Sequence, residues 1–583
     1  MSTSPAAPPG KHRPSSGTTP SGPRAGSALS RRAFLGLVAL ASGTWVVTAH
    51  REDPDDPGRE EPGVAGRAEP GEPPPSAVAT ARVERAVHQP GAPTPSTRWA
   101  VTVDGGMCVV YPTPVETGEA HTSGSWTSFA FAGGPVTVVV THESPVGTAQ
   151  LLPLAKGVTP RVSGSTVTFT LTEPGPYELW VDGDHRNGLH VFANPLVPKP
   201  ARRSVTHYYG PGYYEGTRPD GTALPDQTLV LTSGQSVYVD LNAYVRGHLV
   251  LGANAGTDVA GYRTTDVRAS GYGVVDSQPH PSIASAGRPV AIHNTHGATV
   301  RGLKFLGVTH HGFQIPESRD VLLEDVGLIN WRHVAGDTPD GYDGYGSSSV
   351  TLRRCFARVH DDASAIKNHK RGFGGTSPDG WVGSATDWDY EDCLFINGPG
   401  GNGSEVGYEN FVTRSDGTPF VHRTPTELGR ISYRRHTVVK FRDNVQYRAA
   451  ALGIHLVDRL ACSDVLYEDV EAHVFGGEHP IFVGSFSSPD YDTYADSDTV
   501  AARAKISDVT FRRGRMWTWN AAGTTRTSYP VALHGGGDLA SGKLMTGISF
   551  EDWYINDVKV DAAMQAGGPD VWDQQFCEGP EFL

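Results

Sequence analysis

Cysteine is scarce in this sequence and helical periodicity is absent, and each absence excludes a class of protein. The five cysteines form no C-x-x-C pair, so a zinc or iron–sulfur site has no support. Cys355, Cys393 and Cys462 lie in strand-like runs, where packing or one disulfide explains them better than chemistry does. Because apolar residues do not recur at helical spacing, a predominantly helical fold is also unsupported.

Positive charge is scarce as well. The 583 residues include 49 Lys and Arg against 63 Asp and Glu, for a formal net charge of −14. This balance argues against nucleic acid and anionic membrane surfaces as main partners. Glycine (70) and proline (44) are instead abundant, which favours a turn-rich β protein, and the length allows two or three domains.

Residues 1–49 have the features of an export signal. Arg31 and Arg32 precede an uncharged apolar run from Ala33 to Ala49, and the order Ser-Arg-Arg-Ala-Phe-Leu resembles a twin-arginine signal. We therefore expect a secreted protein with no stable membrane association after cleavage. The alternative is a single membrane anchor, for which the run is somewhat short.

The rest of the chain divides into three segments by composition. Residues 50–96 are rich in Pro, Gly and Glu, which predicts a disordered linker. Residues 97–200 contain short alternating β-branched runs such as GPVTVVVTHE, separated by Gly and Pro, which predicts a β-sandwich. Residues 201–583 carry a recurring pattern.

That pattern is an apolar residue, one variable position, an apolar residue and usually a charged pair. The copies are VLLEDVGLIN at Val321, VTLRRCFARV at Val350, WDYEDCLFIN at Trp388, VKFRDNVQYR at Val439, VLYEDVEAHV at Val465, VTFRRGRMWT at Val509 and ISFEDWYIND at Ile548. Unequal gaps between copies suit a solenoid whose coils carry loops of different length. We predict an all-β, monomeric chain in which a right-handed parallel β-helix follows a small N-terminal β-sandwich.

Three aspartates in this domain carry the strongest chemical signal. Asp340 is followed 21 and 22 residues later by Asp361 and Asp362, about one short coil, so stacking would bring the three close together. Close carboxylates cannot all ionise freely, and one becomes a proton donor while the others stay charged. Glycosidic hydrolysis needs this division, and a separation of roughly 6.5–9.5 Å between acid and base would favour inversion.

Two other interpretations of the acids remain open. Asp-Gly is ordinary turn chemistry, and Asp pairs are common in surface loops. Clustered carboxylates also suit calcium, although we expect neither a metal nor another cofactor.

The stretch PDGYDGYGSSSVTLRRCFARVHDDASAI resembles the signature of polygalacturonases, glycoside hydrolase family 28. GPGGNGSEVGYE resembles that family's Gly-His-Gly-x-x-x-Gly loop, but Asn402 replaces the histidine. The Arg-Ile-Lys motif that binds a uronate carboxylate is missing, and GIHLVD, which contains His455, stands there instead. Galacturonate is therefore a poor candidate substrate.

The dextranases and isopullulanases of glycoside hydrolase family 49 resemble the chain on more counts, including a secreted β-sandwich joined to a β-helix of the pectin-lyase type. Their Asp-Gly-x-Glu-x-Tyr and Asp-Asp-Ala-x-Lys elements are similar to Asp340–Tyr345 and to the Asp361-Asp362 pair with Lys367. The resemblance implies that Asp361 is the general acid and that Asp340 and Asp362 activate water. Asp343 remains a second candidate for the early acid.

Further residues near these motifs are candidates for substrate binding. They are Trp331, Tyr342, Asp343, Tyr345, Lys367, Asn402, Glu405 and His455, with His310 and His311 ranked lower. The aromatic residues could stack on sugars or simply pack, Lys367 could bind sugar hydroxyls or hold a carboxylate ionised, and His455 could contact a neutral sugar or be a packed histidine.

Together these features predict a secreted, inverting glycoside hydrolase acting on a neutral α-linked polysaccharide or oligosaccharide, such as a dextran- or pullulan-like glucan. Three alternatives remain: a polygalacturonase-like hydrolase of acidic glycans, a calcium-dependent eliminase, and a non-catalytic glycan-binding β-helix.

Overall fold

The computed structural model describes most of the chain after residue 80. The described residues are 81–113, 124–252, 264–277, 290–307, 312–330, 339–368, 384–398, 400–407, 412–413, 419–420, 426–441, 449–456, 460–477, 479–485, 505–520, 522–535, 545–575 and 577–583. The predicted export signal lies outside them. Within them, no helix is long and apolar enough to cross a membrane.

The N-terminal domain is a β-sandwich of two mainly antiparallel sheets. One contains β1 (Arg82–Arg85), β4 (Val110–Pro112), β5 (Ser125–Ala132), β7 (Ala149–Leu152), β10 (Gly175–Val181) and β11 (Leu189–Pro195). The other contains β2 (Trp99–Val103), β3 (Gly106–Cys108), β6 (Val136–His142), β8 (Arg161–Ser163) and β9 (Thr166–Leu171). Alternate side chains of both sheets meet in one apolar core.

The sandwich begins earlier than predicted, because β1 lies inside the segment 50–96 that the composition assigned to a linker. Val83 pairs with Phe131 of β5, and the Arg85 side chain donates to the carbonyl of Val103. The strand depends on partners that are distant in sequence. The local composition, rich in Pro and Glu, therefore gave no sign of it.

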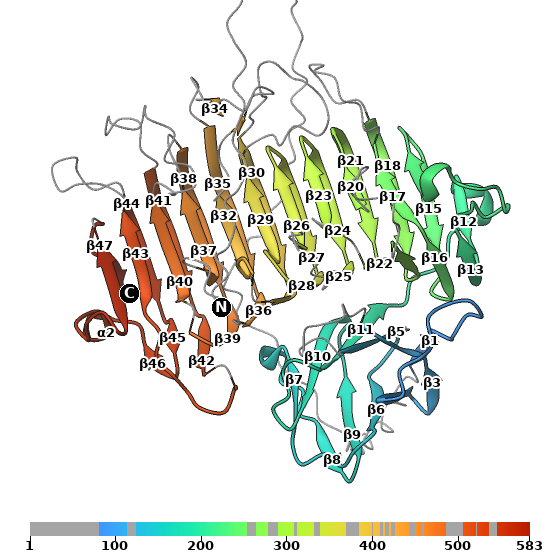
Figure 1. Cartoon of the computed structure of the whole chain (residues 1–583), viewed down its shortest axis with the longest axis horizontal. Coiled ribbons are helices and arrows are strands. Elements are labelled where there is room, and N and C mark those ends of the chain that lie inside the picture. Colours follow the sequence, from blue (N-terminus) through green and yellow to red (C-terminus); the bar gives the residue numbers. More distant parts are fainter. Residues whose placement is uncertain are drawn as a thin grey trace, which may run out of the picture. The chain divides into compact units, whose positions relative to one another are not determined.

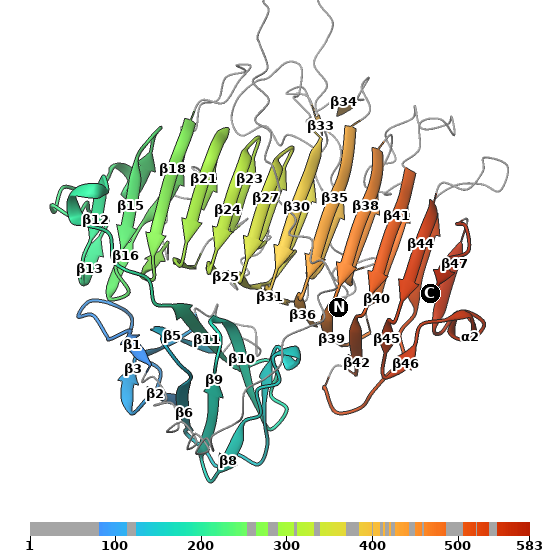
Figure 2. The same ribbon diagram turned by 180° about the vertical axis from the view of Figure 1, so that it is seen from behind.

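The second domain is a parallel solenoid of three sheets, which we call sheets I, II and III (Figures 1 and 2). Sheet I contains β12 (His207–Tyr209), β15 (Ser236–Val239), β18 (Thr264–Gly271), β21 (Thr295–Arg301), β24 (Arg319–Glu324), β27 (Ser348–Arg353), β30 (Ala385–Glu391), β35 (Thr426–Arg434), β38 (Leu460–Glu468), β41 (Lys505–Arg512), β44 (Met545–Glu551) and β48 (Glu581–Phe582). Sheet II contains β13 (Gly212–Glu215), β16 (Ala243–Arg246), β19 (Val274–Asp276), β22 (Lys304–Leu306), β25 (Gly327–Asn330), β28 (Phe356–Val359), β31 (Leu394–Asn397), β36 (Thr437–Phe441), β39 (Glu471–Phe475), β42 (Arg515–Trp519), β45 (Tyr554–Ile555) and β46 (Val558–Lys559). Sheet III contains β14 (Thr228–Leu231), β17 (His248–Leu251), β20 (Val290–Ile292), β23 (Phe313–Pro316), β26 (Tyr342–Tyr345), β29 (Ser364–Lys367), β32 (Ser404–Gly407), β37 (Ala450–Leu456), β40 (His479–Ser485), β43 (Val531–Gly535) and β47 (Trp572–Gln575).

A few short elements complete the described structure. They are the hairpin β33 (Val412–Thr413) and β34 (Pro419–Phe420), the 3₁₀ turns Leu154–Lys156, Arg202–Ser204 and Pro225–Gln227, and helix α2 (Ala562–Gln565). The predicted fold class, a parallel β-helix preceded by a β-sandwich, is confirmed.

The repeated sequence pattern marks sheet I. Six of its seven predicted anchors occupy one register column: Val321, Val350, Trp388, Val465, Val509 and Ile548. Val439 is wrong, because Ile431 occupies that column and Val439 lies in sheet II opposite Ile396. The V-K-F-R-D run imitated the pattern, whereas the true copy is I-S-Y-R-R.

The charged pairs alternate in sign from coil to coil. The seven first members, in register order, are Glu324, Arg353, Glu391, Arg434, Glu468, Arg512 and Glu551, and the single charge of Arg301 precedes them in the same column. From Asp325 onward the second member has a positive φ and turns the chain from sheet I into sheet II. Arg354, for example, grips Asp325 of the preceding coil with nitrogen–oxygen distances of 2.7 and 3.0 Å. We call this column of alternating pairs the charge ladder.

The solenoid interior is filled by stacked apolar residues. Tyr390, Tyr433, Tyr467, Phe511 and Phe550 stack in successive coils with ring centroids 4.5–5.0 Å apart. The five cysteines are all free thiols, so packing rather than a disulfide accounts for the buried Cys355, Cys393 and Cys462.

The sandwich covers the outer face of sheet II. Trp126, Trp180 and Phe192 from the sandwich share one buried cluster with Phe356 and Phe475 of the solenoid. Since one outer face carries the charge ladder and another is covered by the sandwich, the outer face of sheet III remains to be considered for a functional site.

We predict that reversing one charge of the ladder destabilises the fold. Arg354→Glu would place a carboxylate beside Asp325, whose side chain is 8% exposed, and should lower the free energy of unfolding by about 2 kcal/mol. Chemical denaturation would measure the change. Arg513→Glu is the matched control in the more exposed Arg513–Asp469 pair and should cost less. An equal loss at both sites would contradict a role for burial, and adding Asp325→Arg to Arg354→Glu should restore stability.

Candidate functional site

The three acids lie on the turns that lead from sheet II into sheet III. Asp340 precedes β26, Asp361 and Asp362 precede β29, and Asn402 precedes β32. Because these strands pair in register, Asp340, Asp362 and Asn402 occupy equivalent positions of three consecutive coils. The register partner of Asp340 is thus Asp362, with Asp361 one residue ahead.

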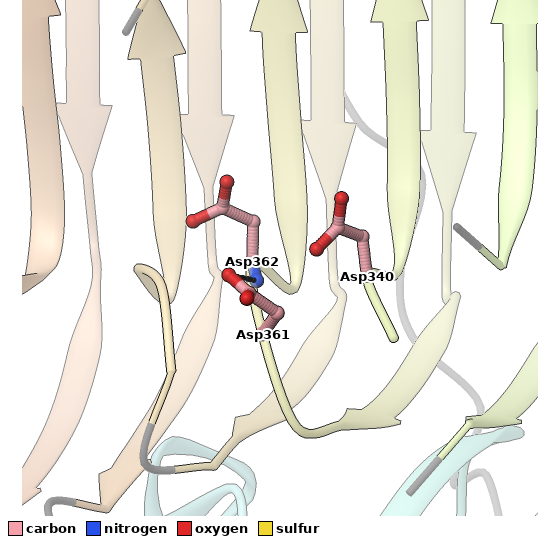
Figure 3. A group of neighbouring side chains, drawn as sticks. All are labelled: Asp340, Asp361 and Asp362. Atoms are coloured by element: carbon pink, nitrogen blue, oxygen red, sulfur yellow. Dashed lines mark hydrogen bonds between the residues drawn. The ribbon is translucent and has the colours of Figure 1, made fainter. Parts of the chain in front are cut away.

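The three carboxyl groups form a compact cluster (Figure 3). One carboxylate oxygen from each of Asp340, Asp361 and Asp362 lies within 4.8 Å of the other two. Asp340 and Asp362 turn their carboxyl groups the same way in Figure 3, and Asp361 lies beside Asp362. Asp340 and Asp362 are buried, whereas Asp361 is partly exposed. The cluster therefore has an outer member that a ligand can reach and two inner members.

Asn402 and Gly401 support the acid pair from the next coil. The backbone N–H of Asn402 donates to Oδ1 of Asp362 at 2.6 Å, and its side-chain carbonyl accepts from the backbone N–H of Ala450. Gly401 has φ +50°, and a Cβ there would lie 2.3 Å from Oδ1 of Asp361. Only glycine fits so close to the pair. Asn402, which replaces the histidine of the Gly-His-Gly-x-x-x-Gly loop, therefore contacts Asp362 through its backbone N–H.

Sequence reasoning missed the residues that hold the turns. Asn330 donates to the carbonyl of Asp340, and Asn397 donates to the carbonyl of Asp361. Lys440 is fully buried and donates to the carbonyls of Gly398 and Gly400. The two asparagines had a visible signal, because GLIN and LFIN end in Asn at the same place of the repeat.

Burial changes the protonation of the acid pair. It raises the pKa of Asp362 well above its ordinary value, and the nearby carboxylates of Asp361 and Asp340 raise it further, while the Lys367 ammonium lowers it. Burial also raises the pKa of Asp361, against the opposing effect of Lys367. The cluster therefore retains a proton more readily than isolated aspartates do.

Lys367 and Tyr345 lie beside the cluster on the outer face of β29 and β26. The Lys367 ammonium is 3.8 Å from Oδ2 of Asp362 and lies over the Tyr345 ring. The Tyr345 hydroxyl donates to Oδ2 of Asp343, which is fully buried. Lys367 thus contacts an acid rather than bulk solvent, whereas the Tyr345 ring is 1% exposed and presents no open face for stacking on a sugar.

Tyr342, a candidate for substrate binding, follows the alternative interpretation and packs in the interior. Its ring lies in the solenoid interior, and its hydroxyl donates to the carbonyls of Val326 and Phe356. Side chains alternate across a strand, so Asp343 on the outer face requires Tyr342 to point inward. Trp331, His310 and His311 lie outside the described residues.

Glu405 and His455 form a buried pair farther along sheet III. Nδ1 of His455 donates to Oε2 of Glu405 at 2.7 Å, and the imidazole stacks on Phe482 with centroids 4.5 Å apart. Oε1 of Glu405 is buried and has no hydrogen-bond partner in the described part of the chain. The side-chain amide of Gln314 on the same outer face is equally unpartnered there. These atoms are fully buried, so a hydroxyl-rich ligand would have to enter between the neighbouring side chains to reach them.

The acid cluster could also contribute to a cation site. Calcium takes six to eight oxygens, so the three carboxylates would supply only part of its ligands. Asp343 is not part of this oxygen cluster, which makes Asp340 the third acid by geometry.

We predict that Asp362→Asn stabilises the fold, increasingly so as pH rises. Because the folded state raises the pKa of Asp362, it binds the proton more tightly than the unfolded chain does, and stability falls as pH rises above the ordinary value of 3.8. Asparagine removes that loss. The variant should gain on the order of 1 kcal/mol at pH 7 and nothing near pH 3, in thermal unfolding followed across pH.

The control is Asp389→Asn, an exposed carboxylate on sheet I that should show no such gain. A pH-independent effect of Asp362→Asn, or a loss at neutral pH, would mean that the cluster is not strained by its charges.

Comparison with known proteins finds likeness in structure but not in sequence. No protein-family model and no curated protein matches the chain. Dex49A from Penicillium minioluteum superposes with a TM-score of 0.51 at 12% identity, covering 86% of this chain and 96% of that protein. A family 28 exopolygalacturonase from Yersinia enterocolitica gives 0.37 at 10% identity, covering 80% and 98%. The Streptococcus pneumoniae adhesin PfbA gives 0.37 at 12% identity, covering 64% and 90%. At these identities the chain shares a fold with Dex49A and nothing more is implied.

Proposed function

We propose that the protein is a glycoside hydrolase that cleaves a neutral α-linked polysaccharide or oligosaccharide with its aspartate trio. The observation that carries the proposal is the cluster of three carboxylates, within 4.8 Å of one another, whose burial raises the pKa of two of them. Carboxyl groups that hold a proton beside others that ionise are what acid–base cleavage of a glycosidic bond requires. The motif resemblance to family 49 and the fold shared with Dex49A support it.

The geometry suggests a role for each acid. In this proposal Asp361, the partly exposed member, protonates the leaving oxygen. Asp340 and Asp362, on adjacent coils and turned the same way, are placed to hold and deprotonate one water between them. Burial works against Asp362 as a base by raising its pKa, and the Lys367 ammonium opposes that rise.

The spacing itself does not select inversion. One oxygen of each carboxylate lies within 4.8 Å of the other two, whereas the acid and base carboxyl groups of inverting enzymes are usually roughly 6.5–9.5 Å apart. We base inversion instead on the two inner acids, Asp340 and Asp362. Two carboxylates side by side suit the binding of a water molecule, whereas retention would require one of them alone to form a covalent ester with the sugar. Proton NMR of the first product formed would show the inverted anomer, and the retained anomer would exclude this assignment.

Charge on sheet III favours a neutral sugar. Lys367 is the only Lys or Arg in the described strands of this sheet, and it already lies beside Asp362. Asp343 and Glu405 add buried acids to the same face. A uronate carboxylate would therefore meet repulsion, whereas sugar hydroxyls would find acceptors.

We also propose that the protein acts outside the cell as a monomer. The twin-arginine pair in residues 1–49 supports export, and a polymer substrate outside the cell is consistent with it.

The test is hydrolysis of dextran, pullulan, arabinan and polygalacturonate by the parent protein and Asp361→Asn. We expect release of reducing sugar from a neutral glycan, reduced more than about a hundredfold in the variant, because general acid catalysis contributes at least that much. Asp389→Asn is the control and should retain full activity.

Each alternative has its own outcome in this screen. Cleavage of polygalacturonate alone would indicate an acidic substrate, and an ultraviolet-absorbing product lost with EDTA would indicate an eliminase. Binding without turnover would indicate a glycan-binding protein, and full activity in Asp361→Asn would exclude the proposed site.

A second prediction concerns Glu405. Its unpartnered oxygen should accept a hydrogen bond from a sugar hydroxyl, so Glu405→Gln should raise KM about tenfold and change kcat less. Asp573→Asn, which alters the His534 pair farther along sheet III, is the matched control and should leave KM unchanged. Steady-state kinetics on the preferred glycan would measure both. An unchanged KM in Glu405→Gln would remove Glu405 from the binding face.

A further inference from the structure

A row of fully buried polar groups joins the sandwich to the strand that leads to the acid pair. Glu178 on β10, His190 on β11 and Arg358 on β28 have no exposed surface. Nδ1 of His190 contacts Oε2 of Glu178, and Nε2 of His190 lies 3.2 Å from a guanidinium nitrogen of Arg358. Arg358 also donates to the backbone carbonyl of Arg186.

The donor and acceptor chemistry orients this row in one way. Arg358 can only donate, so Nε2 of His190 must accept, and its hydrogen must lie on Nδ1, which donates to Glu178. Burial lowers the pKa of His190, in keeping with a neutral ring between a cation and an anion. The row therefore holds imidazole and guanidinium in fixed orientations.

Alternate side chains of strand β11 form the sandwich side of this contact. His190, Phe192 and Asn194 point away from the sandwich core, toward strands β22 and β28 of sheet II. Asn194 accepts from the buried ammonium of Lys304, Phe192 meets Phe356 edge-on, and His190 meets Arg358. Lys304 and Arg358 are thus two buried cations in one interface, on different coils.

Only one of these two coils carries the acid pair Asp361 and Asp362. Arg358 belongs to β28, and the chain leaves that strand at Val359 to reach Asp361 two residues later. The amides of His360 and Asp361 each donate to the carbonyl of Pro339 at 3.2 Å, so the turn is short and directly attached to the strand. Lys304 lies in β22, whose next turn carries no member of the trio.

A buried charged row is costly to form and is seldom the most stabilising choice for an interface. Replacing such groups by apolar residues is often neutral or favourable for stability. Apart from such polar contacts as Lys304 with Asn194, the interface is aromatic and aliphatic, so apolar packing was available here. The row instead fixes one lateral position of β28 against the sandwich, which sliding apolar surfaces do not do.

We propose that Glu178, His190 and Arg358 form a positioning relay through which the sandwich fixes the turn that carries Asp361 and Asp362. This inference deepens the proposed hydrolase function and rests on it for its kinetic consequence. The three residues touch no reacting atom and act through the placement of the acid pair.

The first experiment compares Arg358→Met with Lys304→Met in the full-length protein. Both remove a buried cation from the same interface, but only Arg358 adjoins the acid turn. Arg358→Met should lower kcat about tenfold or more with KM unchanged, because small misplacements of catalytic groups are costly, whereas Lys304→Met should change kcat less than about twofold. Equal losses of kcat in both variants, or no loss in Arg358→Met, would overturn the relay.

The second measurement does not depend on activity. Hydrogen exchange of the segment 359–363 should quicken in Arg358→Met and not in Lys304→Met, since its amides bond to the neighbouring turn. Should the parent protein hydrolyse no glycan, the hydrolase proposal fails while this comparison still decides the relay. Unchanged exchange in Arg358→Met would refute it.

A conservative replacement at the centre guards against simple misfolding. His190→Gln can still donate to Glu178 and accept from Arg358, so it should keep kcat and slow exchange, whereas His190→Leu can do neither and should behave as Arg358→Met. Identical behaviour of the two His190 variants would show that the hydrogen bonds have no role in positioning.

Discussion

The in-register pairing of consecutive coils is the constraint on which the rest of the structure depends. Parallel strands repeat at a spacing of about 4.8 Å, so a residue type that recurs once per coil becomes a column. The charge ladder is one such column, and Asp340, Asp362 and Asn402 form part of another. A one-residue slip would turn Asp343 inward and Tyr342 outward, which the apolar interior prevents. The same register that builds the core thus assembles the acids.

Asp340 and Asp362 lie on neighbouring coils and are both buried, so their negative charges repel one another. Two contacts offset this repulsion: the Asn402 backbone N–H donates to Asp362, and the Lys367 ammonium lies near it. Gly401 has no side chain, which lets its backbone lie close to Asp361 and Asp362. Lys440 serves the other side of the turn, where it binds backbone carbonyls. The site is a strained place in an otherwise consistent fold, as functional sites commonly are.

The sequence predicted what is local and repeated. The column of six anchors and the proximity of the acid trio could be predicted from the repeat and the spacing, because each coil repeats the same sequence pattern. Val439 misled because a strand of sheet II imitated that pattern, and the orientation of Tyr342 stayed open because the start of β26, which decides which side chains face inward, is not encoded in D-G-Y-D-G-Y itself. His190 and Arg358 lie 168 residues apart and come from different domains, so no spacing rule could join them.

The charge ladder also restricts how such a solenoid can change in length. Acidic and basic pairs alternate through seven consecutive coils, from Glu324 to Glu551. Loss or duplication of a single coil would bring two pairs of like sign together, whereas loss or duplication of two preserves the alternation. When this part of the solenoid gains or loses whole coils during evolution, it should therefore do so two coils at a time.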